Sequence, residues 1–276
     1  MKDRNEFRRE IQAIQDEIGP ESFAYDPDEF WMIRAPYETI QFYAMHRQLR
    51  NTAIALPLAR GLHNGSHRKS TLTKNGKAYR LPYVIHCLLV CRMLVDLHLP
   101  LPKEEEDIVL AAALCHDMIE DIAFENGGWE LVTKYHLDPR VYETVKQVSK
   151  RRDFTPEEEV EFFRGIQEHP FALLVKLSDR SNNVEDMYNM SAWKVHEYIG
   201  ETERFFHPMA VYGMEHYPGL IGPLEILRDK ILCLTQISQI LVDRCEARTQ
   251  ELRRELEILQ AENNRLREEL QALFIG

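Results

Sequence analysis

The 276-residue chain is long enough for one large domain with an appendage, and its 44% hydrophobic and 29% charged residues are ordinary for a globular protein. No apolar run approaches the roughly 18 residues that a membrane span needs, and the charged N-terminus lacks the apolar core of a secretory signal. A formal net charge of −11 argues against broad nucleic-acid binding. The five cysteines are an odd count and form no CxxC pair, which favours a reducing, cytoplasmic location. Because no segment could span a bilayer, we expect no membrane partner.

The apolar spacing is helical along most of the chain, so we predict an all-α fold. A helix over 3–18 is followed by a loop rich in proline and aromatic residues up to Pro36, a helix over 37–60 and a long basic loop from Gly61 to Pro82. Further helices are expected over 83–98, 104–121, 139–151, 156–168, 171–188 and 192–213. We identify no strand pattern of any length and no glycine-rich phosphate loop.

The last part of the chain, from Ile226 to Leu273, is predicted to be one long helix because it contains no proline or glycine. Within it the spacing alternates between four and three residues, in the series Leu252, Leu256, Leu259, Asn263, Leu266, Leu270 and Leu273. Leucine at every heptad position d and a single Asn at position a are typical of a parallel two-stranded coiled coil. We therefore expect a homodimer through 252–273; the alternative is a helix packed on its own domain.

Four ionisable residues stand in apolar helical surroundings, where each is costly unless it is paired or bound to a metal. His116 and Asp117 follow a run of alanines, His86 lies in an apolar segment, and Asp179 ends another. Singly, each has an ordinary explanation, such as a core histidine or the polar end of an amphipathic helix. Together, imidazole and carboxylate suit a borderline divalent ion such as Mn, Fe or Zn, so the four are our predicted metal ligands.

The two carboxylates that follow, Glu120 and Asp121, come four residues after His116 and Asp117. Residues four apart share one helix face, which would put a second carboxylate pair beside the metal. Such a pair could orient a water molecule and accept its proton. They are our predicted catalytic residues.

The order H…HD…D resembles the HD superfamily of phosphohydrolases. The finer motifs resemble the hydrolase domain of RelA/SpoT-type enzymes, which remove the 3′-pyrophosphate from (p)ppGpp in the stringent response. The matching stretches, over roughly 45–218, are His63-x-Gly65-x-x-Arg68-Lys69, Pro82-Tyr83-x-x-His86, His116-Asp117-x-x-Glu120-Asp121, Lys176-Leu177-x-Asp179-Arg180-x-x-Asn183 and Glu201-Thr202-x-x-Phe205-Phe206-x-Pro208-x-Ala210.

This resemblance implies an HD-domain helical bundle with a manganese-like ion and a small nucleotide substrate. It also implies substrate contacts by Arg68, Lys69, Asn183 and Thr202. It divides the chain into an N-terminal helical extension over 1–40, a hydrolase domain over 41–218 and a C-terminal zipper helix over 219–276, which leaves no room for the family's synthetase domain. The basic cluster at 150–152 is a further candidate for a distal diphosphate, or simply a solvated loop.

The chain departs from the family pattern at four places. Ser66 replaces the usual Gln, the segment from Lys69 to Pro82 is longer, Ile122 replaces a Thr, and Asn182 replaces a His. None of these removes a predicted ligand or catalytic carboxylate, but the first two lie where the nucleotide would bind. Two alternatives therefore stay open: an HD phosphohydrolase that acts on another nucleotide or phosphorylated cofactor, and a non-catalytic dimer that senses a nucleotide.

Overall fold

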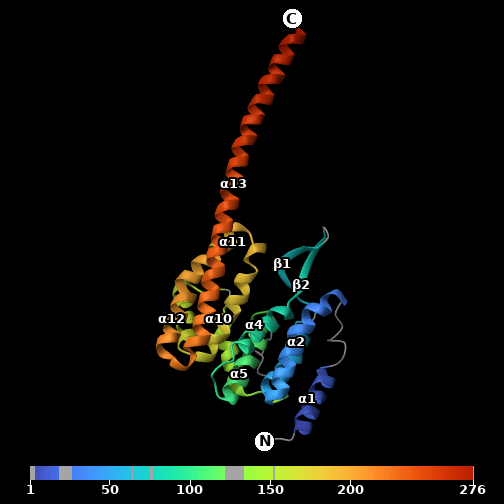
Figure 1. The fold of residues 1–276 in the computed structure, drawn as a ribbon, viewed down its shortest axis with the longest axis vertical. Coiled ribbons are helices and arrows are strands. Elements are labelled where there is room, and N and C mark those ends of the chain that lie inside the picture. The colour runs from blue at the N-terminus through green and yellow to red at the C-terminus, as the bar shows by residue number, and fades with distance from the viewer. Residues whose placement is uncertain are drawn as a thin grey trace.

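The computed structural model describes residues 4–18, 27–63, 65–74, 77–121, 134–151 and 153–275. Nearly all of these are helical, which confirms the predicted all-α fold. Figure 1 shows a helical body from which one long C-terminal helix projects. Of the helices in the described ranges, none is long and apolar enough to cross a membrane.

The N-terminal helices are α1 (Arg4–Ile18), α2 (Pro27–Arg47) and α3 (Arg50–Leu62). The expected loop up to Pro36 is wrong over 27–36, because α2 runs through Pro36. A proline inside a helix leaves the carbonyl four residues earlier without its amide partner. Here that residue is Met32, whose 36% exposure puts it at the surface. α1 packs on α3 and α2 on α4, and Phe7 and Ile11 of α1 join the main core.

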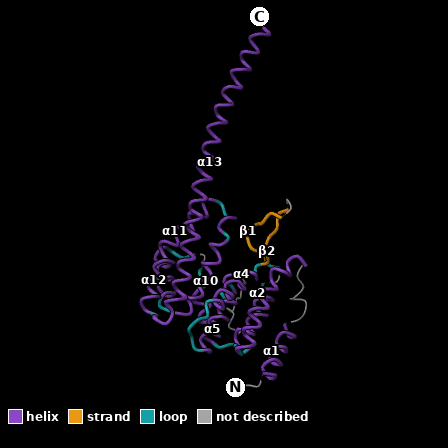
Figure 2. Tube along the Cα trace, in the orientation of Figure 1, coloured by secondary structure: helices purple, strands orange, loops and turns teal. Residues whose placement is uncertain are grey.

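The basic segment after α3 is a β-hairpin, not the loop we expected. Strands β1 (His67–Lys74) and β2 (Lys77–Pro82) pair antiparallel, with Thr71 opposite Arg80, and appear in orange in Figure 2. The dipeptide Asn75-Gly76 between them is a strong hairpin signal that our reading of the sequence overlooked. The many basic residues masked the short alternation on either side of it.

The centre of the body consists of α4 (Val84–Asp96), α5 (Lys103–Cys115), α8 (Pro139–Val148) and α10 (Pro170–Glu185). α4, α5 and α10 contact one another pairwise, and α8 packs on α5 and α10. α5 is buried from Glu106 to Cys115, as expected for a helix that is apolar on all sides. At its start the Asp107 carboxylate accepts hydrogen bonds from the backbone N–H groups of Asn51 and Thr52, which ties the beginning of α3 to α5.

The remaining described elements complete the body: α6 (Met118–Asp121), α9 (Pro156–Gln167), η2 (Met187–Asn189), α11 (Ala192–Glu201), η3 (Thr202–Phe206), α12 (His207–His216) and η4 (Pro218–Leu220). The 55-residue helix α13 (Ile221–Ile275) packs its first part against α10, α11 and α12. The proposed division at 40 and 218 stays a prediction, although α1 and α2 share the core of the body.

Candidate metal centre

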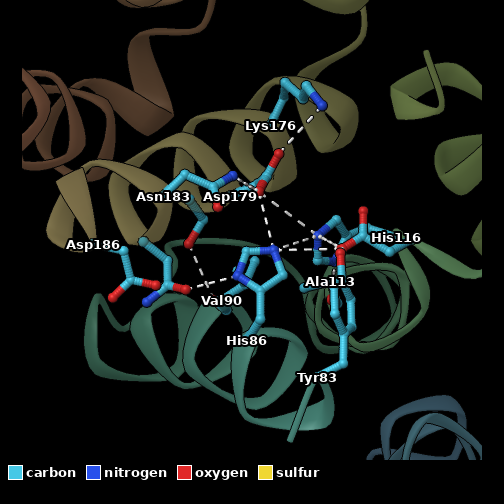
Figure 3. A network of polar contacts seen from close by, with 12 residues as sticks. Tyr83, His86, Val90, Ala113, His116, Lys176, Asp179, Asn183 and Asp186 are labelled. Atoms are coloured by element: carbon cyan, nitrogen blue, oxygen red, sulfur yellow. Dashed lines mark hydrogen bonds and ion pairs between the residues drawn. The ribbon is translucent and has the colours of Figure 1, made fainter. Parts of the chain in front are cut away.

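Three central helices bring the four predicted metal ligands together. His86 lies in the first turn of α4, His116 and Asp117 directly follow α5, and Asp179 lies on α10. Both histidines are 2% exposed and Asp179 is 7% exposed. Figure 3 shows the side chains of His86, His116 and Asp179 converging from their separate helices. The sequence had placed these residues in one site, and the packing of α4, α5 and α10 explains how they meet.

The donor atoms of the cluster lie at distances that suit a shared cation. His86 Nε2 is 3.2 Å from His116 Nε2 and 3.2 Å from Asp179 Oδ1. Asp117 Oδ2 is 3.0 Å from His116 Nε2 and 3.4 Å from His86 Nε2. An ion about 2.1 Å from each donor would separate neighbouring donors by about 3.0 to 3.4 Å. The residues present therefore fit a divalent metal.

Two overlapping sets of side chains meet the distance requirement for a metal, one with His86, His116 and Asp179 and one with Cys87, His116 and Asp117. We assign Asp117 to the first set because its Oδ2 also lies close to His86 Nε2, as well as to His116. The resulting site has two imidazoles and two carboxylates. Nitrogen and oxygen donors of this kind suit Mn, Fe or Zn without selecting among them.

Both histidine rings are oriented by hydrogen bonds at the nitrogen that faces away from the cluster. His86 Nδ1 lies 2.7 Å from Asn182 Oδ1, and His116 Nδ1 lies 2.8 Å from the carbonyl oxygen of Ala113. Because both partners are oxygen acceptors, each Nδ1 carries a hydrogen, and each Nε2 can offer its lone pair to a cation once it has lost its own proton. Such a bond behind a ligand fixes its tautomer and its direction.

The two carboxylates are held in the same way. The Tyr83 hydroxyl donates to Asp117 Oδ2 at 2.7 Å. Asp179 accepts from Asn183 Nδ2 at 2.6 Å and pairs with Lys176 Nζ at 3.2 Å. The site is thus assembled in advance, with the ligand side chains restrained by neighbours rather than left to be ordered by the ion.

The electrostatics of the cluster favour a cation. Burial lowers the pKa of His86, but hydrogen bonds with Asp117 and Asp179 outweigh it and raise this pKa to about 9. Burial raises the pKa of Asp117, yet the charge and hydrogen bonds of His116 and His86 hold it well below its usual value. Two ionised carboxylates in a buried pocket need compensating positive charge, which protons or a metal ion can supply.

Arg68 reaches the edge of this centre from the hairpin. Its guanidinium donates to Asn182 Oδ1 at 3.1 Å and to Asn183 Oδ1 at 2.9 Å, and it pairs with Asp186 at 3.2 Å. Asn182 is therefore shared between Arg68 and the ligand His86, and Asn183 between Arg68 and the ligand Asp179. Through these two amides the predicted substrate-binding arginine contacts the residues that hold the ligands.

The other predicted site residues differ in what the structure says of them. Glu120 and Asp121 end the short helix α6, three and four residues after Asp117, but their side chains lie outside the described part of the structure, as does that of Lys69. Thr202 is fully buried: its hydroxyl accepts from Arg180 and donates to the carbonyl of Tyr198. The structure therefore places Thr202 in the packing between helices, with its hydroxyl committed to protein partners.

The basic cluster at 150–152 is paired with carboxylates where it is described. Lys150 contacts Glu159 and also lies 3.8 Å from Glu201, while Arg151 donates to Glu158 at 3.0 Å. Arg152 lies outside the described residues. These pairings make the cluster a weaker candidate for a diphosphate than Arg68.

Two residues with a positioning role were missed by sequence reasoning. Tyr83 appeared only as part of a motif, and Asn182 only as a departure from one. Asn182 directly precedes Asn183, and Tyr83 lies three residues before His86, but neither periodicity nor spacing shows which side chain turns toward a candidate ligand. That information depends on how the start of α4 faces the end of α10.

Comparison with protein families gives a match to the HD domain over residues 83–184. A search of curated proteins returns no match. All four candidate ligands lie inside the matched segment, together with Tyr83, Asn182 and Asn183. Residues 83–184 therefore match the HD domain, and this match together with the His/Asp cluster indicates a metal-dependent phosphohydrolase.

Proposed function

We propose that this protein removes the 3′-pyrophosphate of (p)ppGpp, giving GDP or GTP and pyrophosphate. The HD domain and its cluster support hydrolysis of a phosphate ester. The observation that supports the guanosine substrate is the position of Arg68, which reaches from the hairpin to the rim of the cluster and contacts Asn182 and Asn183. Arg68 and Asn183 both belong to the RelA/SpoT-like motifs in the sequence.

The reaction needs a water molecule, a path for its proton and a leaving group. The water oxygen bonds to the phosphorus attached to the ribose 3′ oxygen, the bond between that phosphorus and the 3′ oxygen breaks, and pyrophosphate departs. The 3′ oxygen takes up a proton, and the water gives one up. In our proposal Glu120 and Asp121 orient the water and accept its proton.

His86, His116, Asp117 and Asp179 would hold the ion, which we expect to be manganese. When bound, such an ion lowers the pKa of water and polarises a phosphoryl oxygen. The protein residues around it keep the ligands in place: Asn182 orients His86, and Tyr83 and Asn183 restrain the two carboxylates.

Arg68 and Lys69 would bind the purine or the phosphates. A guanidinium donates hydrogen bonds from N–H groups in its plane, as Arg68 does to the two asparagines, and it can stack on a planar base through its face. Asn183 would hydrogen-bond the ribose or the base when Arg68 moves toward the substrate. Thr202 could contribute only after giving up its bonds to Arg180 and Tyr198, so it is the weakest of the four.

The direct test is to incubate the protein with ppGpp and Mn²⁺ and to identify the products. We expect GDP and pyrophosphate in equal amounts, and none from Asp117→Asn. Release of single phosphates, or no turnover of ppGpp at any metal concentration, would contradict the proposal. Arg68→Ala should raise KM more than it lowers kcat, because the arginine binds the substrate rather than the reacting water.

A second candidate is an HD phosphohydrolase that acts on another nucleotide or phosphorylated cofactor. It is favoured by the hairpin β1–β2, which occupies the stretch where the chain is longer than the RelA/SpoT pattern and which carries Arg68. A panel of nucleotides and phosphorylated cofactors, assayed separately for phosphate and pyrophosphate, distinguishes the two. Tight nucleotide binding without turnover would instead support the non-catalytic sensor.

A further inference from the structure

The second half of α13 extends away from the body with its side chains in solvent. Every described side chain from 243 to 271 is exposed, and Figure 1 shows this stretch projecting beyond the other elements. Its exposed leucines, each between 48% and 62% accessible, are Leu252, Leu256, Leu259, Leu266 and Leu270. A single helix is marginally stable in water, and most helices gain their stability by packing an apolar face. This face therefore needs a partner.

We propose that the partner is a second copy of this chain, in a parallel, in-register two-stranded coiled coil through residues 252–273. The alternating spacing of four and three residues places the leucines along one seam, which suits an identical helix. The one interruption is Asn263 at position a. An Asn amide opposite leucine would lose its hydrogen bonds on burial, whereas two Asn side chains facing each other across the seam satisfy one another.

The charges beside the seam select the parallel orientation. Position g carries Glu255, Glu262 and Glu269, and position e carries Arg253, Gln260 and Arg267. In a parallel dimer each g residue faces position e five residues later in the other copy, so Glu262 faces Arg267 of the partner subunit. In an antiparallel pair g faces g and e faces e, which sets glutamates against glutamates and arginines against arginines.

The seam is accessible over 252–273 because every described side chain of α13 from 243 to 271 is exposed. Ile231, which is 2% exposed, marks the side of α13 that packs on the body. Leu259 follows it by 28 residues, about a quarter of a turn short of eight turns. Val242, two heptads before Leu256 and at the same position a, is partly buried against Met187 and Val195, so the seam meets the body only upstream of residue 243. A second helix can therefore lie along residues 252–273, beyond this contact with the body.

The first experiment is sedimentation equilibrium of the full-length protein over a range of concentrations. We expect a mass of twice the 32.5 kDa of one chain. Leu259→Glu should give monomers, while Ile258→Glu, its neighbour at position c with 66% exposure against 62%, should leave the dimer intact. Circular dichroism at 222 nm checks that the body stays folded in both. A monomeric wild type, a trimer, or a dimer that survives Leu259→Glu overturns the proposal.

The second experiment tests orientation and register. In a chain whose exposed Cys233 and Cys245 are changed to serine, Leu266→Cys places one thiol at position d near the end of the helix. A parallel, in-register dimer brings the two introduced thiols together, so mild oxidation should give a covalent dimer in high yield. Glu268→Cys, on the outer face two residues away, is the control and should give little. Equal yields from the two variants would rule out this seam.

Discussion

The metal centre and the second half of α13 differ in how far their side chains are buried and in where their contacts lie. In the centre, His86 is 2% exposed and every candidate ligand has a described partner behind it. Along the projecting helix, Leu259 is 62% exposed and lies in a stretch, 243–271, whose described side chains are all exposed. The side chains of the metal centre find their protein partners within one chain, whereas the exposed leucines of the projecting helix do not. The two regions should therefore respond differently to equivalent substitutions.

The difference shows that tertiary packing determines the geometry of the metal centre, whereas the local sequence determines the properties of the projecting helix. Three helices that pack on one another leave little freedom for the side chains between them, so the site depends on residues that are far apart in the chain. A lone helix has no neighbours to restrain it, so its properties follow from the local sequence. Four predictions, in decreasing order of expected effect, test this contrast.

The largest effect is expected on removing a ligand. His116→Gln takes away one of the two imidazoles and should abolish stoichiometric binding of Mn²⁺, measured by isothermal titration calorimetry, together with hydrolase activity. His98→Gln, at an exposed histidine outside the cluster, should bind the metal as the wild type does. Treating the wild type with a chelator should reproduce the loss of activity, and added Mn²⁺ should restore it only in the wild type and in the His98 variant.

The second effect concerns stability. Leu88 is fully buried on α4, two residues after the candidate ligand His86. Leu88→Ala should lower the free energy of unfolding by about 2–5 kcal/mol, because it leaves a cavity. Leu256→Ala, at a residue 54% exposed on α13, should change the unfolding of the body by roughly 0.5 kcal/mol or less. Urea denaturation measures both. Equal losses would mean that the projecting helix is packed on the body.

The third effect tests the hydrogen bond behind His86. Asn182→Ala removes the acceptor 2.7 Å from His86 Nδ1, so the ring loses its fixed tautomer. Metal affinity should fall by about 10- to 100-fold, the usual cost of losing such a partner. Asn182→Asp keeps an oxygen acceptor and should recover most of the affinity. Asn264→Ala, at an exposed amide on α13, serves as the comparison and should leave metal affinity unchanged.

The smallest effect is expected at Tyr83. Tyr83→Phe removes one hydrogen bond, 2.7 Å long, to Asp117 and keeps the ring that packs beside His63. One such bond contributes about 1 kcal/mol, so metal affinity should fall by about fivefold. Tyr188→Phe, at a 68% exposed tyrosine, is the matched control. A loss as large as that of Asn182→Ala would mean that the hydroxyl has a further role.

Much of the helical architecture could be predicted from the sequence, and the failures have local causes. α5 was expected to be buried because it is apolar on all sides. α13 was expected to be one long helix because 226–273 contains no proline or glycine. The hairpin at 67–82 was missed because its strands are short and basic. Residues 27–36 of α2 were missed because Pro36 was taken to end a loop. In the site, the four candidate ligands could be chosen from the sequence because ionisable residues in apolar helical segments are costly unless they are paired or bound to a metal.

By itself the amino-acid sequence determined the helices, the heptad seam of α13 and the identity of the four candidate ligands, because periodicity and the cost of burying charge depend on residue type and spacing. Only the tertiary structure decided that Asn182 holds His86, that Arg68 reaches the rim of the centre and that Thr202 is committed to Arg180. Those contacts join residues that are 22 to 114 positions apart. Their geometry depends on how whole helices pack, which no local pattern encodes.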